Sequence, residues 1–272
     1  MDTDTPRNDQ HTTAGRYRGS PAELYERHFV PKIGLPCAEL LVDAARPAAG
    51  ERIIDVACGT GVATRLAAER VGPDGKVAGV DGHPGMLAVA QTSSDRPIEW
   101  RHASADGLPY GDDSFDVALC SLGLQFFADK IRALSEMRRV VVNGGRLAVG
   151  VPGPIPPMMQ DLHDALIPHV GVEVAAFVQA VFVLDDPDRL AALCHTAGWG
   201  DASVETHSLI LELDPPADFL WQYLLGTPLA AATADLDLDE QRNLEADVVK
   251  RWRQYETTDG SEMTIDLHIA VA

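Results

Sequence analysis

The 272-residue chain has little that would support a metal centre, a disulfide framework or a membrane anchor. Its four cysteines are far apart, and none belongs to a Cys-x-x-Cys pair or a Cys/His cluster, so no metal site is predicted. We expect four reduced thiols, as in cytoplasmic proteins. The most apolar stretch, residues 169–184, is interrupted by Glu173 and Gln179 and is too short to cross a bilayer. Residues 1–20 are polar with mixed charge, which is not the pattern of a signal peptide.

Basic residues are also scarce. The chain has 22 lysine and arginine residues against 41 aspartate and glutamate residues, which gives a formal net charge of −19. A surface of this sign repels phosphate backbones, so nucleic acid is not expected as a partner. The excess of acidic residues favours solubility, and a preference for neutral or cationic substrates is the alternative interpretation.

One ten-residue segment, residues 52–61, carries the most information. Ile53 and Ile54 are β-branched and predict a buried strand. Asp55 follows them, and a turn with Gly59 and Gly61 then leads into a helical run. Glycine lets a backbone approach a ligand closely, and the free N–H groups of a helix start favour a negative group. The segment therefore predicts a site for a small polar ligand.

A dinucleotide is the first ligand to consider, and the glycine pattern argues against it. Counted from Gly59 as Gly-x-Gly-x-x-Gly/Ala, the third position is Thr64, which is too bulky for the close helix–strand contact of that motif. A short-chain nicotinamide reductase is disfavoured further, because no tyrosine is followed four residues later by lysine.

A second predicted strand, residues 76–81, ends in another carboxylate, Asp81. At the tip of the neighbouring strand, an acidic residue can accept hydrogen bonds from both hydroxyls of a ribose. Met86 opens the helix that follows, where its thioether lies either against an adenine ring or in the core. The two strand ends together favour a nucleoside-containing ligand.

These segments resemble the class I S-adenosylmethionine-dependent methyltransferases. The similarity lies in residues 55–61 (DVACGTG) and 79–87 (GVDGHPGML), and it extends to residues 104–117 and 136–147. Within the family, the chain most resembles the ubiquinone/menaquinone-biosynthesis C-methyltransferases. The resemblance implies S-adenosylmethionine as cofactor and an α/β fold. That fold is a Rossmann-like, seven-stranded, mostly parallel sheet with helices on both faces and a helical substrate cap.

The resemblance also implies a set of cofactor-binding residues. Asp55 would organise the methionine end, or else cap the turn, and Asp81 would bind the ribose. Ser104 stands where many relatives have aspartate, so it would accept a weaker hydrogen bond from the adenine amino group. Ala57 replaces a glycine, which is tolerated if its φ is negative. The full set is Asp55, Ala57, Gly59, Gly61, Asp81, Gly82, Met86, Ser104, Ala105 and Ser121.

Candidate substrate contacts are Tyr25, His28 and Gln125. Gln125 lies in the turn after the fourth strand, where it either bonds substrate or ties down the loop. That turn lacks the Asn/Asp-Pro-Pro-Tyr/Phe sequence of enzymes that methylate exocyclic or amide nitrogens. Asp106 is expected in solvent, and His83 either flanks the adenosine or is a solvated turn residue. No general base is assignable, so no catalytic residue is predicted.

The pattern along the chain predicts five parts. We expect a disordered tail over residues 1–19, lid helices over 20–50, a cofactor-binding core over 51–152, a helical cap insertion over 153–200, and the remaining core strands with inserted helices over 201–272. After the first two strands, further strands are expected at 98–102, 115–121, 146–151, 202–213 and 263–271. In the family, the last strand runs antiparallel beside the fifth.

The sequence thus supports methyl transfer to an oxygen, carbon or nitrogen atom of a small, largely apolar metabolite in the cytoplasm. A quinone, a phenol, a polyketide-like compound or another product of secondary metabolism would fit. Phe126, Phe127, Phe177 and Phe182 motivate the apolar acceptor, although each also fits a core position. The alternative is a cofactor-binding protein without transfer activity, serving as a regulatory or scaffold subunit. Neither interpretation assigns an oligomeric state.

Overall fold

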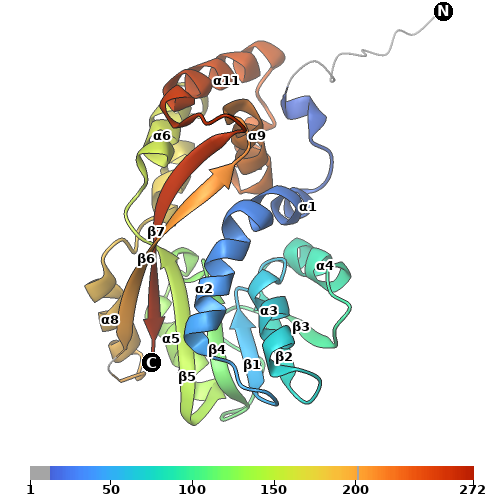
Figure 1. Ribbon diagram of the computed structural model, residues 1–272, viewed down its shortest axis with the longest axis vertical. Helices are drawn as coiled ribbons and strands as arrows, with labels where there is room; N and C mark the ends of the chain where they lie inside the picture. Colours follow the sequence, from blue (N-terminus) through green and yellow to red (C-terminus); the bar gives the residue numbers. More distant parts are fainter. Residues whose placement is uncertain (1–12, 201) are drawn as a thin grey trace, which may run out of the picture. The chain divides into compact units, whose positions relative to one another are not determined.

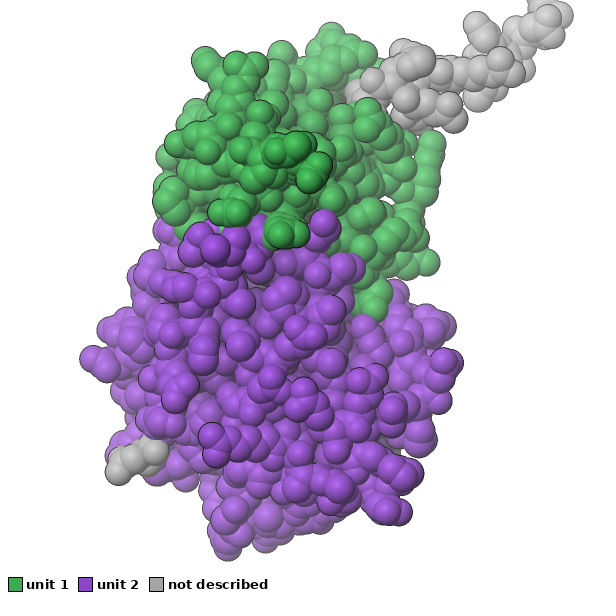
Figure 2. Space-filling model, in the orientation of Figure 1, with its two compact units in different colours: residues 1–29, 156–179, 212–263 green, residues 30–155, 180–211, 264–272 purple. Residues whose placement is uncertain are grey.

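The computed structural model describes residues 13–200 and 202–272, which form two compact units (Figures 1 and 2). Of these residues, unit 1 takes 13–29, 156–179 and 212–263, and unit 2 takes 30–155, 180–211 and 264–272. Each unit is therefore assembled from segments that are far apart in the sequence. The expected division into a cap over residues 153–200 and a core after it does not follow these boundaries, because residues 180–200 fold with unit 2.

A seven-stranded sheet forms the centre of unit 2 (Figure 1). Its strands are β1 (Arg52–Val56), β2 (Lys76–Asp81), β3 (Ile98–His102), β4 (Phe115–Ser121), β5 (Val141–Pro152), β6 (Ser203–Leu213) and β7 (Ser261–Val271). They lie in the order β3-β2-β1-β4-β5-β7-β6. Neighbours among the first five strands are parallel, and β7 pairs antiparallel with β5. The Rossmann-like sheet implied by the resemblance is confirmed.

The fifth strand is longer than predicted. It begins at Val141 rather than near Arg146, because Val141 already pairs with Phe115 of β4. The register then shifts before Val117 pairs with Arg146, so residues 143–145, which include Gly144 and Gly145, form an irregularity within the strand.

The strands carry long apolar runs because both faces of the sheet are covered. Ile54 lies in a core that includes three residues of α5 (Lys130–Val140). Asp55 points to the opposite face, since successive side chains of a strand alternate, and it contacts Thr64 of α3 (Val62–Val71). The other helices of unit 2 are α2 (Leu35–Ala45), α4 (Pro84–Thr92), η3 (Leu124–Phe126) and α8 (Pro187–Thr196).

Unit 1 is helical, and two tryptophans join its helices. Its elements are η1 (Ala14–Arg16), α1 (Pro21–Leu24), α6 (Pro157–Val170), most of α7 (Val172–Val181), α9 (Pro216–Gly226), α10 (Leu229–Thr233), α11 (Leu238–Trp252) and η4 (Arg253–Tyr255), while η2 (Tyr25–Gly34) continues into unit 2. The indole N–H of Trp252 donates to the Met158 carbonyl at 2.8 Å, and that of Trp221 donates to Glu245 at 2.7 Å. The buried indoles thus tie α11 to α6 and α9 to α11.

The sequence predicted a disordered tail over residues 1–19, but residues 13–19 are held by contacts with the rest of unit 1. The Tyr17 hydroxyl donates to the Asp218 carboxylate at 2.8 Å, and the Tyr17 ring meets His28 edge-on at 5.2 Å. The prediction was wrong here because one aromatic side chain anchors an otherwise polar segment. For residues 1–12, the prediction lies outside the described residues.

Trp100 occupies the space beneath the glycine turn between β1 and α3. A Cβ atom on Gly61 would lie 2.5 Å from Cη2 of Trp100, and one on Gly79 would lie 2.5 Å from Cζ3 of the same ring. Gly61 also has a φ of +88°, which L side chains rarely adopt. A Cβ on Gly59 would meet nothing within 4 Å. The two glycines therefore have different roles: Gly61 makes room for the half-buried indole of Trp100, and Gly59 borders open space.

Asp55 is fully buried at the end of β1. Its Oδ2 accepts a hydrogen bond from the Thr64 hydroxyl at 2.5 Å. Thr64, which stands at the third position of the glycine pattern, is therefore the partner of this carboxylate. Its Oδ1 accepts no hydrogen bond within the part of the chain that the structure describes. Burial raises the pKa of Asp55 to about 7, and the nearby Asp81 charge adds to the effect while the Thr64 hydrogen bond opposes it.

We expect Gly61→Ala to destabilise unit 2 much more than Gly59→Ala. Both substitutions impose a positive φ on an L residue, at a cost of about 1–2 kcal/mol. Only the first drives a methyl group into Trp100, which adds about 1–3 kcal/mol. Urea unfolding of both variants measures the difference. Equal losses in the free energy of unfolding would contradict the contact with Trp100, and a Trp100→Leu background should reduce the gap.

Asp55 should make the folded protein less stable as pH rises from about 4 to about 7. Over this range the folded state retains a proton that the unfolded chain has released. The free energy of unfolding therefore falls by about 1.4 kcal/mol for each unit by which folding raises the pKa. Asp55→Asn keeps an acceptor for Thr64 and removes the charge. The variant should therefore gain stability over the wild type at pH 8 but not at pH 4. A difference in urea-unfolding free energy that does not change with pH would rule this out.

Candidate functional site

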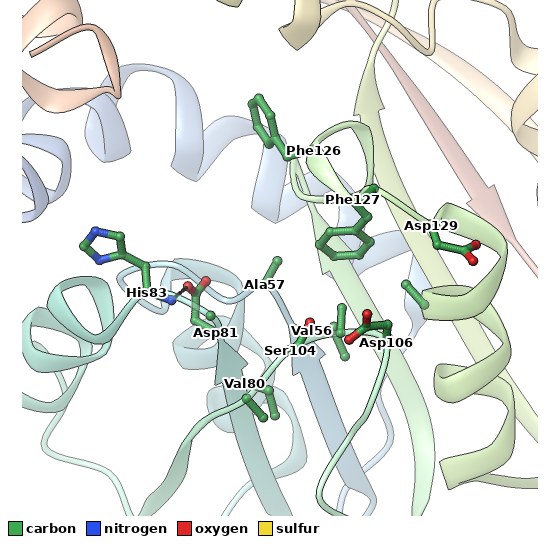
Figure 3. A pocket seen from close by; sticks show the side chains of 15 residues that line it. Val56, Ala57, Val80, Asp81, His83, Ser104, Asp106, Phe126, Phe127 and Asp129 are labelled. Carbon is green, nitrogen blue, oxygen red and sulfur yellow. Dashed lines mark hydrogen bonds between the residues drawn. The ribbon is translucent and has the colours of Figure 1, made fainter. Parts of the chain in front are cut away.

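A cavity of about 380 Å³ lies at the carboxyl ends of β1, β2 and β3 and beside the segment after β4, within unit 2 (Figure 3). Its volume falls in the range of small-molecule sites. β1 lies between β2 and β4, and the chain leaves it in one direction and returns on its other side, which is the place where open α/β sheets bind ligands. The lining residues are Val56, Ala57, Val80, Asp81, Gly82, His83, Ala103, Ser104, Ala105, Asp106, Phe126, Phe127, Ala128, Asp129 and Ala133.

The Asp81 carboxylate is held by backbone amides on both of its oxygens. Oδ2 accepts from Gly59 N–H at 2.8 Å, and Oδ1 accepts from His83 N–H at 2.7 Å. Figure 3 shows the second of these bonds. These bonds fix the side chain at the tip of β2 and join the turn after β1 to the turn after β2. A carboxylate accepts about four hydrogen bonds, so capacity remains on both oxygens for a ligand.

His83 is exposed and also has a structural role at the start of α4. Its Nδ1 accepts from Met86 N–H at 3.2 Å, which makes His83 the N-cap of the helix, and the residue is among those that line the cavity. Met86, predicted to bind cofactor, is half-buried on α4 and is not among the residues that line the cavity.

Ser104 and Ala105 line the cavity, as the resemblance implies, and so does Asp106. The sequence placed Asp106 in solvent; its side chain is exposed, but at the edge of the cavity (Figure 3). These residues belong to a loop without regular structure between β3 and β4. Ala103 N–H donates to the Asp81 carbonyl at 3.1 Å, which attaches the start of this loop to the end of β2.

Phe126 and Phe127 form an apolar part of the cavity lining. Both come from the segment after β4, and the Phe126 side chain is 51% exposed (Figure 3). A core position was the alternative for both residues, and Phe127 does pack against the core while it also lines the cavity. Their adjacency in a turn gave no signal for this, because neither strand nor helix periodicity applies there.

The backbone is strained where the turns after β1 and β4 meet. Ala57 has a φ of +59° and Leu122 one of +53°, both in the left-handed region. The condition for alanine at position 57, a negative φ, is therefore not met. A Cβ on Gly123 would lie 2.6 Å from the Ala57 methyl carbon. Only glycine at position 123 leaves room for this methyl group, and the sequence gave no indication of that. Such strain is typical of functional sites.

Gln125 ties down this turn. Its side-chain amide donates to the Leu122 carbonyl at 2.8 Å, and only 5% of the residue is exposed. Of the two roles considered for Gln125, the structure shows the loop contact. The amide oxygen accepts no hydrogen bond from the described residues. Ser121, at the end of β4, is half-buried and pairs with Gly150 outside the cavity lining.

Tyr25 and His28, the other candidate substrate contacts, lie in unit 1. Tyr25 stacks on Phe29 at 4.5 Å, and His28 packs edge-on against Tyr17. Burial lowers the pKa of His28, and the neighbouring Arg27 acts in the same direction. A substrate role for either residue stays a prediction.

The cavity is acidic. Asp81, Asp106 and Asp129 line it, and no lysine or arginine does so among the residues described. Asp55 lies close enough to Asp81 for their charges to interact. A site with this balance favours a ligand that carries positive charge. Across residues 13–200 and 202–272, no three histidine, cysteine or carboxylate side chains gather as a metal site would need. None of the helices in those ranges is long and apolar enough to span a membrane.

Residues 54–149 match a family described as a methyltransferase domain. The chain is 38% identical over 113 residues to the 2-phytyl-1,4-naphtoquinone methyltransferase of Thermosynechococcus vestitus, covering 41% of this chain and 50% of that protein. It thus spans about half the length of this relative. The demethylmenaquinone methyltransferase of Clavibacter sepedonicus is 32% identical over 180 residues, which cover 61% of this chain and 71% of the relative.

A solved structure agrees on the fold. The putative methyltransferase from an antibiotic biosynthesis pathway of Anabaena variabilis superposes with a TM-score of 0.58 at 17% identity, covering 88% of this chain and 97% of that one. The glycine turn, the Asp81 anchor and the match to these relatives lead to one assignment. The chain belongs to the class I S-adenosylmethionine-dependent methyltransferases, in the ubiquinone/menaquinone-biosynthesis-like branch, and its cofactor is S-adenosylmethionine.

Proposed function

We propose that this protein transfers the methyl group of S-adenosylmethionine to a small, largely apolar metabolite of the quinone or phenol class. One observation carries the proposal: the cavity combines the anchored Asp81 carboxylate with the aromatic rings of Phe126 and Phe127. The first suits a ribose, and the second suits an apolar acceptor. The relatives named above support the quinone class, since their names describe methyltransferases for a naphthoquinone and for demethylmenaquinone.

The residues at the cavity fit the cofactor. Asp81 retains acceptor capacity on both oxygens for the two ribose hydroxyls. Asp55 does not itself line the cavity, but its buried Oδ1 lacks a donor within the described chain, which suits a carboxylate that receives the ammonium end of the methionine portion, directly or through water. Ser104 and Ala105 are then left for the adenine, because they line the cavity beyond Asp81.

When bound, S-adenosylmethionine supplies a methyl group already activated by a sulfonium leaving group. The chain therefore has to hold the acceptor atom in line with the bond between the methyl carbon and the sulfur, and it has to exclude water; it does not have to activate the methyl group itself. The Gln125 bond to Leu122 holds the turn that carries Phe126 and Phe127. The acidic lining favours the binding of the cationic cofactor.

A direct assay tests this function. The purified protein is incubated with S-adenosylmethionine and a panel of naphthoquinols, benzoquinols, phenols and aliphatic amines, and products are sought by mass spectrometry. We expect one added methyl group on members of the quinol or phenol set. Cofactor binding without turnover across the whole panel would instead favour a regulatory or scaffold subunit. Turnover of amines alone would contradict the proposed acceptor class.

Asp81→Ala should weaken the binding of S-adenosylhomocysteine, measured by calorimetry, by at least about tenfold, since charge-assisted hydrogen bonds to the ribose contribute about 1.5–3 kcal/mol each. Asp106→Ala is the matched control, because this exposed aspartate also lines the cavity but does not anchor the two turns. We expect its dissociation constant to stay near the wild-type value. Equal weakening in both variants would show that overall negative charge, and not the position of Asp81, determines affinity.

A further inference from the structure

The loop over residues 103–112 forms one part of the cavity lining without any strand or helix of its own. Four of its residues, 103–106, line the cavity. Its internal backbone hydrogen bonds are few, with Gly107 N–H donating to Ser104 O at 3.2 Å and Tyr110 N–H to Leu108 O at 2.9 Å. A loop of this kind takes its position from the side chains of neighbouring elements.

Helix α5 supplies these side chains. Arg132 donates from Nε to the Asp106 carbonyl at 3.1 Å. Glu136 accepts from Leu108 N–H at 3.0 Å, and Arg139 donates to the Leu108 and Tyr110 carbonyls at 3.2 and 2.8 Å. Positions 132, 136 and 139 are four and three residues apart, which places them on one face of the helix. Three turns of α5 therefore bind backbone groups along the loop.

The three side chains also hold one another. Arg139 makes two hydrogen bonds to the Glu136 carboxylate, at 2.7 and 2.9 Å, and Arg132 approaches the same carboxylate at 3.6 Å. The Glu136 side chain is only 8% exposed. The paired Arg139 lowers the pKa of Glu136, so its carboxylate remains an ionised, charge-assisted acceptor for the Leu108 amide. Removal of one partner leaves a buried charge without compensation.

We propose that Arg132, Glu136 and Arg139 are positioning residues of the cofactor site, which fix the backbone of residues 104–106 and thereby set the affinity for the adenosine half of the cofactor. The inference rests on the proposed function. It is supported by the place of α5 itself, because Asp129 and Ala133 of the same helix start line the cavity. One helix thus borders the cavity and holds the loop that completes it.

Arg138 provides a matched control on the same helix. It donates to the Val141 carbonyl at 2.8 Å and to Asn143 at 2.7 Å, and it lies over the Trp199 ring. These contacts lie outside the loop and the cavity lining. Arg138→Met should therefore lower the free energy of unfolding without changing cofactor affinity, whereas Arg139→Met should change both.

The test compares wild type, Arg139→Met, Glu136→Gln and Arg138→Met. Amide hydrogen exchange of the protein without cofactor reports the position of Leu108 directly, and calorimetry gives the dissociation constant for S-adenosylhomocysteine. We expect Arg139→Met and Glu136→Gln to exchange Leu108 at least about tenfold faster and to bind at least about tenfold more weakly, with partial recovery in Arg139→Lys. Glu136→Gln keeps the side-chain volume and an acceptor oxygen, so it serves if Arg139→Met does not fold.

Two results would overturn the inference. One is faster exchange at Leu108 with an unchanged dissociation constant, which would make these residues purely structural. The other is equal weakening by Arg138→Met, which would trace the effect to loss of stability. If the wild-type protein itself does not bind S-adenosylhomocysteine, the proposed function fails, and the inference fails with it.

Discussion

The two hydrogen bonds that the Asp81 carboxylate accepts hold together the turns from which the site is built. One comes from the turn after β1 and the other from the turn after β2, so a single side chain fixes both with respect to the sheet. The cost is electrostatic. A second carboxylate, Asp55, is buried near the first, and its pKa is raised mainly by burial and further by the Asp81 charge. Ionisation of Asp55 is therefore costly unless a positive group binds nearby.

Packing beneath the turn makes that arrangement rigid. Trp100 fills the space left by Gly61 and Gly79, so the strands and the turn close on one indole ring. Thr64 pairs with Asp55 from the first turn of α3, and Gln125 holds the neighbouring loop through the Leu122 carbonyl. The strained residues are stabilised by these contacts around them, and a preorganised site of this kind loses less entropy when a ligand binds.

Local patterns in the sequence predicted the strands and the helix starts, because these depend on neighbouring residues. β-branched residues in the strands are one such pattern, and the start of α8 is another, since Asp186 precedes Pro187 and its side chain accepts from Asp188 N–H. The cofactor and the ribose-binding role of Asp81 came from the resemblance of the motifs to a known family. The roles of Trp100, Gly123 and Arg139 did not, because each depends on a contact with a residue distant in the sequence. The positive φ of Ala57 was not predicted because a residue type alone does not determine φ. Residues 13–19 were expected to be disordered because the partner of Tyr17, Asp218, lies far along the chain in α9.

The contact between Ala57 and Gly123 also restricts how the sequence of the site can change over time. Alanine at both positions would bring two methyl carbons to 2.6 Å, so the space between the turns holds one methyl group and not two. A lineage that moves this methyl from one turn to the other has to pass through glycine at both positions. The two sites are therefore linked in evolution: a change at either is tolerated or harmful according to the residue already present at the other.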